Sequence, residues 1–167
     1  STIRAKQRLD SWLRALALAA TGTPGTSSHV MGQRSTYQRG RGYVKAPTRL
    51  FHHGLGPEAA TGLLDRLVDL RDRGLREPLP LSPATSEAWA EAFAQGDVRK
   101  ADERARKQWE TAPFTKGPPG EQYAPAHVLA FGERAAYNDI LGVPHDDELW
   151  TSGVPSRLGQ LALRLWA

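Results

Sequence analysis

The apolar residues of this chain recur every three to four positions over most of its length, which is the period of an amphipathic helix. The pattern is clearest between residues 57 and 73, where leucines and Val68 share one side and aspartates and arginines take the other. We therefore expect helices over residues 2–20, 57–73, 85–94, 97–111, 124–131, 133–141 and 156–166. The first helix is expected to turn five side chains toward a core: Leu9, Trp12, Leu13, Leu16 and Leu18.

Two runs near the N-terminus have the composition of strands instead. They are SSHVMGQ at 27–33 and YVKAPTRLF at 43–51, and the glycine-rich 40–42 between them predicts the turn of a hairpin. Pro47 cannot donate a hydrogen bond to a ladder, so the second strand should lie at a sheet edge or contain a bulge. The sequence thus predicts an α+β fold, mostly helical, with one small antiparallel sheet or hairpin.

The length of 167 residues suits one domain with a real core, because a domain of this size buries about 70% of its unfolded surface. We expect a single domain over 1–167, made of a helix (1–20), a basic hairpin (27–53), helices with a proline loop (57–111), and an irregular region with a terminal helix (112–167). The chain lacks an initiator Met and begins almost inside a helix, which suggests a fragment of a longer protein.

A stiff proline loop joins two of the predicted helices. Gly74 suits a helix end, and Pro78, Pro80 and Pro83 then favour an extended path before Thr85 or Ser86 caps the next helix. This stretch has the character of a docking surface and contains no obvious catalyst. The candidate docking residues are Pro78, Leu79, Pro80, Leu81 and, in a later loop, Trp150, for which ordinary packing is the alternative.

Charge is distributed unevenly along the chain. Residues 1–50 hold nine Lys or Arg against Asp10 alone, whereas the whole chain carries only +4. Such asymmetry can mark a nucleic-acid face, or the arginines can pair with carboxylates elsewhere in the fold or on a partner. If DNA is bound, the candidates for contacting phosphate are Arg34, Arg39, Arg41, Lys45 and Arg49.

The candidate strands contain histidines and a lysine but no Asp or Glu, so a nuclease site with carboxylate-bound Mg²⁺ is not expected on them. His52 and His53 are adjacent and would point to opposite faces of a strand, which disfavours a shared metal ion. The acidic run at 145–148 lacks the glycine of a calcium loop and is expected to be solvated. We therefore expect no catalytic residue, metal or cofactor in this chain.

The absence of cysteine fits a reducing cytoplasm, and no apolar run approaches the roughly 20 residues that span a membrane. A cytoplasmic protein without a membrane segment is the expectation.

Four segments of the chain carry a resemblance to a known family. They are LLDRLVDLRDRGLREPLPLSPATSEAW at 63–89, RLDSWLRALAL at 8–18, ERARKQWE at 103–110 and SRLGQLALRLW at 156–166. Together they resemble the C-terminal region of the gamma subunit of exodeoxyribonuclease V, the RecC family. The family's acidic segment after the Trp-Glu helix is replaced here by residues 122–125, where only the aromatic Tyr123 is retained.

The resemblance implies a degenerate nuclease-like fold, of the PD-(D/E)XK type, that has lost its catalytic carboxylates. It implies a non-catalytic scaffold and DNA guide within an ATP-dependent helicase-nuclease that repairs double-strand breaks for homologous recombination. The alpha and beta subunits of that complex, and DNA, would be its partners. A protein-interaction module without DNA contact remains the alternative.

Overall fold

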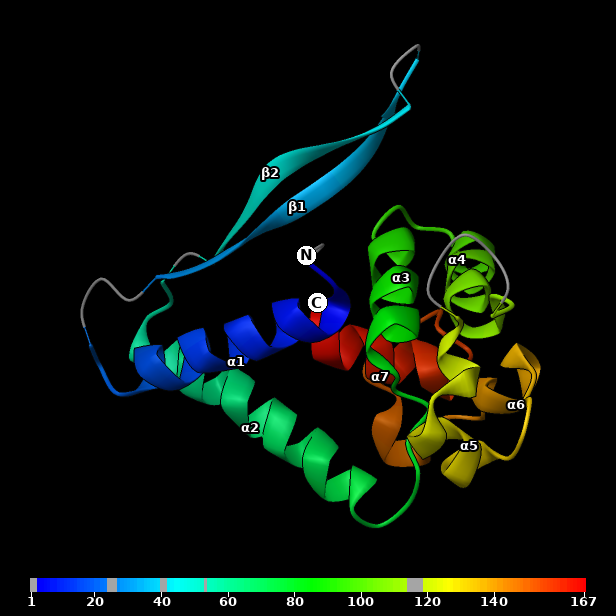
Figure 1. The fold of residues 1–167 in the computed structure, drawn as a ribbon. Helices are drawn as coiled ribbons and strands as arrows, with labels where there is room; N and C mark the ends of the chain where they lie inside the picture. The colour runs from blue at the N-terminus through cyan, green and yellow to red at the C-terminus, as the bar shows by residue number, and fades with distance from the viewer. Residues whose placement is uncertain (1–2, 24–26, 40–41, 53, 114–118) are drawn as a thin grey trace. The chain divides into compact units, whose positions relative to one another are not determined.

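The computed structural model describes residues 3–23, 27–39, 42–52, 54–113 and 119–167 (Figure 1). Its helices are α1 (Ala5–Ala20), α2 (Pro57–Gly74), α3 (Pro83–Phe93), α4 (Val98–Glu110), α5 (Pro125–Phe131), α6 (Tyr137–Leu141) and α7 (Arg157–Trp166), with short 3-10 helices at Glu121–Tyr123 and Asp146–Glu148. The strands are β1 (Ser28–Gln38) and β2 (Gly42–His52), which form one antiparallel sheet. The α+β class predicted from the sequence is confirmed.

The chain divides into two compact units, residues 1–67 and residues 68–167, and the boundary falls within α2. Each unit has its own apolar cluster. The single domain expected from the sequence stays a prediction.

In the first unit, α1 packs against the beginning of α2. Leu16, Ala19 and Ala60 are buried there, with Trp12 and Leu63 among the partly buried neighbours. Trp12, Leu16 and Ala19 follow the spacing of one helix face, and this face sets the side that is buried. Two residues expected in the core lie off this face and are exposed, Leu13 and Leu18, the latter to 54%.

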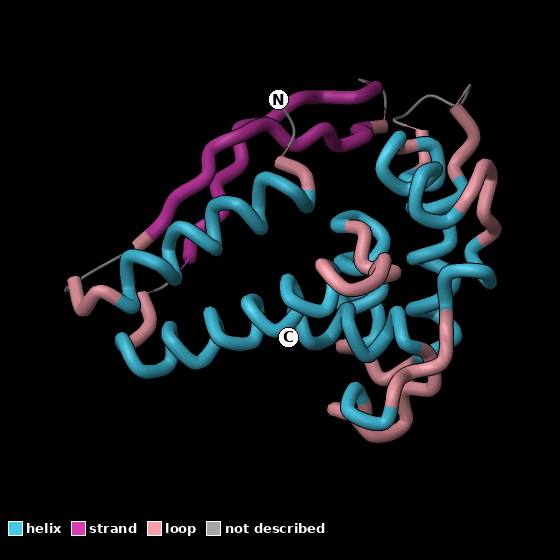
Figure 2. Tube along the Cα trace, turned by 90° about the horizontal axis from the view of Figure 1, so that it is seen from below, coloured by secondary structure: helices cyan, strands magenta, loops and turns pink. Residues whose placement is uncertain are grey.

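The hairpin is longer than its sequence pattern suggests. β1 and β2 pair from Ser28↔His52 to Gln38↔Gly42 in one uninterrupted register, so Pro47 lies in a strand edge without a bulge. The two strands form a long twisted ribbon, and α1 runs beside part of it (Figures 1 and 2). The hydroxyls of Ser11 and Ser28, 2.8 Å apart, join α1 to the first residue of β1.

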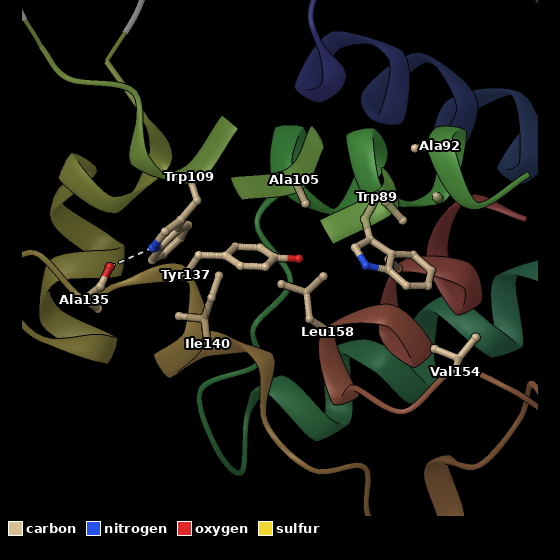
Figure 3. Packing of buried hydrophobic residues seen from close by; sticks show 12 residues of the cluster. Trp89, Ala92, Ala105, Trp109, Ala135, Tyr137, Ile140, Val154 and Leu158 are labelled. Carbon is tan, nitrogen blue, oxygen red and sulfur yellow. Dashed lines mark hydrogen bonds between the residues drawn. The ribbon is translucent and has the colours of Figure 1, made fainter. Parts of the chain in front are cut away.

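The second unit is built on α3, α4 and α7, with Trp89 and Trp109 buried in its core and Tyr137 and Leu158 between them (Figure 3). Both indole N–H groups have partners: Trp89 donates to Asp102 at 2.8 Å, and Trp109 donates to the carbonyl of Ala135 at 2.8 Å. Asp102 also accepts from the hydroxyl of Tyr137 at 3.0 Å. Both tryptophans are therefore buried with their polar atoms paired.

The start of α3 differs from the expectation that Thr85 or Ser86 caps it. The helix begins at Pro83, because the first helical position needs no N–H donor and suits the fixed φ of proline. The carboxylate of Glu121 takes the capping role and accepts from the backbone N–H groups of Ala84 and Thr85 at 3.0 and 2.8 Å. A cap from a residue so distant in sequence leaves no local signal.

Candidate functional site

The exposure of the described hairpin side chains alternates over residues 28–33 and over residues 47–52, as the pleat of a sheet requires, whereas Lys45, Ala46 and Pro47 are all exposed. Every second cross-strand pair has exposed side chains where these are described. The exposed side chains are those of His29 and Phe51, Met31 and Arg49, Gln33 and Pro47, and Lys45. Side chains of the other set, such as Val30 and Leu50, are half-buried. We call the exposed set the outer face of the hairpin.

The basic candidates fall at different places on this hairpin. Lys45 and Arg49 belong to the outer face, and Arg39 is exposed just after β1. Arg34 pairs with Ala46 and so belongs to the other set of alternate pairs. Arg41 lies outside the described residues.

Arg49 holds an aromatic neighbour in place on the outer face. Its Nε donates to Nδ1 of His29 at 2.9 Å, and its Nη2 lies 2.6 Å from the same nitrogen. A guanidinium can only donate, so this imidazole nitrogen acts as an acceptor. The His29 ring in turn contacts the ring of Phe51, with centroids 4.6 Å apart and planes tilted by 47°.

Nothing in the local sequence marks His29 and Phe51 as site residues. Phe51 reads as an ordinary strand residue, and the contact with His29 depends on a cross-strand pair that is 22 residues apart in sequence. The available signal was the period of two, which places His29, Met31, Arg49 and Phe51 on one face once the register is known.

The other face of the hairpin is turned toward α1. His52 lines a small pocket with Trp12, Leu16 and Leu55, and burial lowers the pKa of its imidazole. Its neighbour His53 lies outside the described residues. Within the part of the chain that the structure describes, no three His, Cys, Asp or Glu side chains gather where a metal ion could be held.

The four docking candidates of the proline loop, residues 78–81 in the second unit, differ in how far they are exposed to solvent. Pro78 is exposed, Leu79 and Leu81 are half-buried, and Pro80 is buried. Pro80 therefore serves packing in this fold, and Pro78 offers its ring to solvent.

Trp150 is half-buried and lies against two arginines of the second unit. The guanidinium carbons of Arg73 and Arg164 lie 5.3 and 4.7 Å from the centroid of its indole ring. Arg73 also contacts Asp147 at 2.7 Å and Asp69 at 3.1 Å. Hydrogen bonding to Asp147 is the main reason that the pKa of Arg73 is raised.

The expectation of a solvated acidic loop at 145–148 is wrong for Glu148. This side chain has 0% exposure and forms two hydrogen bonds to Arg157, which also reaches Glu77. Burial alone would raise the pKa of Glu148, but the bonds from Arg157 and from the backbone N–H of His145 hold it below its usual range. The charged run lies partly inside the fold because its counter-ion comes from α7.

No helix within the described ranges is long and apolar enough to cross a membrane.

Comparison with known proteins gives one consistent result. A family model described as the RecC C-terminal domain matches residues 1–94. The chain is 39% identical over 168 residues to RecBCD enzyme subunit RecC of Mycobacterium tuberculosis strain H37Rv, and 36% identical over 172 residues to that of Mycolicibacterium smegmatis. Each alignment covers 99% of this chain and 14% of the relative. With a family model matching more than half of its residues, the chain belongs to the RecC C-terminal domain family.

Proposed function

We propose that this chain acts as a non-catalytic scaffold and DNA guide within a RecBCD-type helicase-nuclease. The relatives are named as RecC subunits of the RecBCD enzyme, and this chain spans 14% of their length. On this proposal its partners are the alpha and beta subunits, its process is repair of double-strand breaks by homologous recombination, and its location is the cytoplasm. The nuclease-like fold belongs to the same proposal.

The observation that carries the guide role is the charge of the hairpin. The hairpin segment, residues 27–53, has no acidic residue in its sequence and five basic ones. The side chains of three of these residues, Arg39, Lys45 and Arg49, are exposed to solvent. Basic side chains without neighbouring carboxylates in the sequence are suited to neutralise phosphates, a contact that gives affinity without sequence choice.

A salt series tests this role. The chain is titrated into a fluorescently labelled forked duplex, without magnesium, and binding is followed by anisotropy at increasing salt. A guide that neutralises phosphates must bind less tightly as salt rises, with a linear dependence of log K on log salt. Absence of binding even at low salt would leave a scaffold only.

A protein-docking module without DNA contact is the second candidate, and exposed apolar residues favour it. Leu75, Val143 and Leu149 of the second unit are exposed to 70%, 81% and 64%. Glu77, two residues after Leu75, contacts His145, and His145 lies in sequence between Val143 and Leu149. Glu77 also contacts Arg157. If these side chains gather on one surface, they would form an apolar patch of the kind that docks partner proteins.

Capture of separately purified alpha and beta subunits by the chain tests this second candidate. The variants Val143→Glu and Leu149→Glu should each reduce capture if this surface docks. Leu129→Glu is the matched control, because Leu129 is exposed to 90% in the same unit. Equal capture by all three variants would remove the surface from consideration.

A further inference from the structure

The outer face of the hairpin combines positive charge with aromatic rings, and its phosphate-binding role above does not use the rings. His29 and Phe51 are directly paired across the strands and their rings touch. Phe51 keeps 41% of its surface exposed, and the neighbouring Met31 keeps 80%. The exposed area is thus apolar and aromatic between cationic side chains.

We propose that His29 and Phe51 form a stacking platform for the bases of single-stranded DNA, with Arg49 and Lys45 contacting its phosphates. This inference rests on the proposed guide function and names the form of DNA that the hairpin takes. The planar rings match the faces of nucleobases, and stacking on aromatic side chains accepts any base.

Pairing geometry explains why the ligand is a single strand. In a duplex both faces of each base pair are covered by the neighbouring pairs, so a side chain on a protein surface cannot stack on them. An unpaired strand exposes these faces and can place a base on the ring of Phe51. The platform therefore requires a strand that is already unpaired when it reaches the hairpin.

Arg49 prepares the platform before DNA arrives. Its guanidinium donates to Nδ1 of His29 at 2.9 Å, which fixes the imidazole beside the Phe51 ring. Little side-chain freedom is then lost on binding, and this lowers the entropic cost of association. The same guanidinium keeps its charge and can attract a phosphate next to the stacked base.

An acidic peptide would match the charge of this face, but it has no reason to select aromatic rings. The acid-free sequence between Asp10 and Glu58 attracts any polyanion. Only a ligand with planar apolar groups between its charges uses both features, and single-stranded DNA has that composition. The peptide is therefore an alternative outcome of the test.

The test compares two ligands on the full 167-residue chain. One is a labelled oligothymidylate of about 12 nucleotides, within the range of known site sizes, and the other is an abasic deoxyribose-phosphate strand of equal length. Stacking of one base corresponds to a preference of about fivefold or more for the strand that carries bases. Salt dependence should be the same for both strands, since both present the same phosphates.

Variants of Phe51 separate stacking from folding. Phe51→Leu should abolish most of the preference while leaving abasic affinity unchanged, and Phe51→Trp should retain it. A 2-aminopurine in the strand reports stacking directly, because its fluorescence falls on binding to the native chain and should not fall with Phe51→Leu. Leu18→Ala, at another exposed apolar side chain of the same unit, is the control and should change neither signal.

Equal affinity for both strands, or a preference that survives Phe51→Leu, would overturn the platform. If both strands bind with the same salt dependence, the guide function still stands, and a poly-glutamate that competes equally would identify the face as a general anion surface. Absence of binding to either strand would overturn the guide function and the platform together.

Discussion

Arg157 and Glu148 form a buried two-point ion pair. Nε of Arg157 lies 2.7 Å from Oε2 of Glu148, and Nη2 lies 2.8 Å from Oε1. Glu77 contacts the same guanidinium at 2.5 Å, and this links the residues after α2 to the start of α7. The packing of the second unit therefore includes a buried ion pair between residues of two different segments. Neither the segment around Glu148 nor the segment around Arg157 predicts this pair by itself.

Removing one partner of this pair should be costly. Glu148→Ala leaves the buried guanidinium of Arg157 without its main counter-ion, and breaking a buried pair in this way costs about 3–5 kcal/mol. Urea unfolding measures the change in free energy. Asp10→Ala is the control, because it breaks an exposed pair with Arg14 that is worth about 1 kcal/mol or less. Equal effects of the two variants would contradict a structural role for the buried pair.

The same network should make stability depend on pH in the acid range. The pKa of Glu148, of Glu77 and of Asp147 is lowered in the folded chain, so each carboxyl binds protons more readily when unfolded. Their contribution is complete above the unfolded pKa of about 4, and it is lost as the pH falls through the lower folded values.

Urea unfolding of the native chain and of Glu148→Gln between neutral pH and about pH 3 tests this sign. The native chain should lose more stability over this interval than the variant, which has one fewer group to protonate. Parallel curves would show that Glu148 does not carry the dependence.

Gly159 should not tolerate a methyl group although it lies inside α7. A Cβ at this position would stand 2.7 Å from Cζ2 of Trp89 and 2.7 Å from Cγ1 of Val154, both in the buried core. Alanine favours a helix by about 1 kcal/mol over glycine, but overpacking a core costs about 1–3 kcal/mol.

We therefore expect Gly159→Ala to lower the melting temperature. Gly62→Ala in α2 is the matched control, since its Cβ would meet nothing within 4 Å, and it should raise the melting temperature slightly. A stabilised Gly159→Ala chain would mean that Trp89 can move.

Local periodicity accounts for much of this fold. The helical spacing of leucines located α2 and α7, and single polar residues located helix starts where the cap is local, as at Asp97 and Ser156. Both side chains accept a backbone N–H in their own first turn. Each of these caps spans only four consecutive residues, so the local sequence contains the information needed to predict it.

The features that sequence reasoning missed all depend on distant partners. Glu148 is buried because Arg157 and its helix cover it, and the cap of α3 comes from Glu121. β1 extends to Gln38 through polar residues because cross-strand pairing with β2 stabilises it. The candidate site shows the same limit, since the ring pair of His29 and Phe51 exists only in this register.

The most direct test of the guide function compares the salt dependence of DNA binding in two triple variants. One replaces Arg39, Lys45 and Arg49 with alanine, and the control replaces Arg99, Arg104 and Lys107, three exposed residues of α4. Each phosphate contact contributes roughly 0.9 to the slope of log K against log salt for duplex DNA and roughly 0.7 for a single strand. The hairpin variant should lose up to about 3 from this slope and the control should keep it. An unchanged slope in the hairpin variant, or an equal loss in both, would contradict the role of the hairpin in guiding DNA.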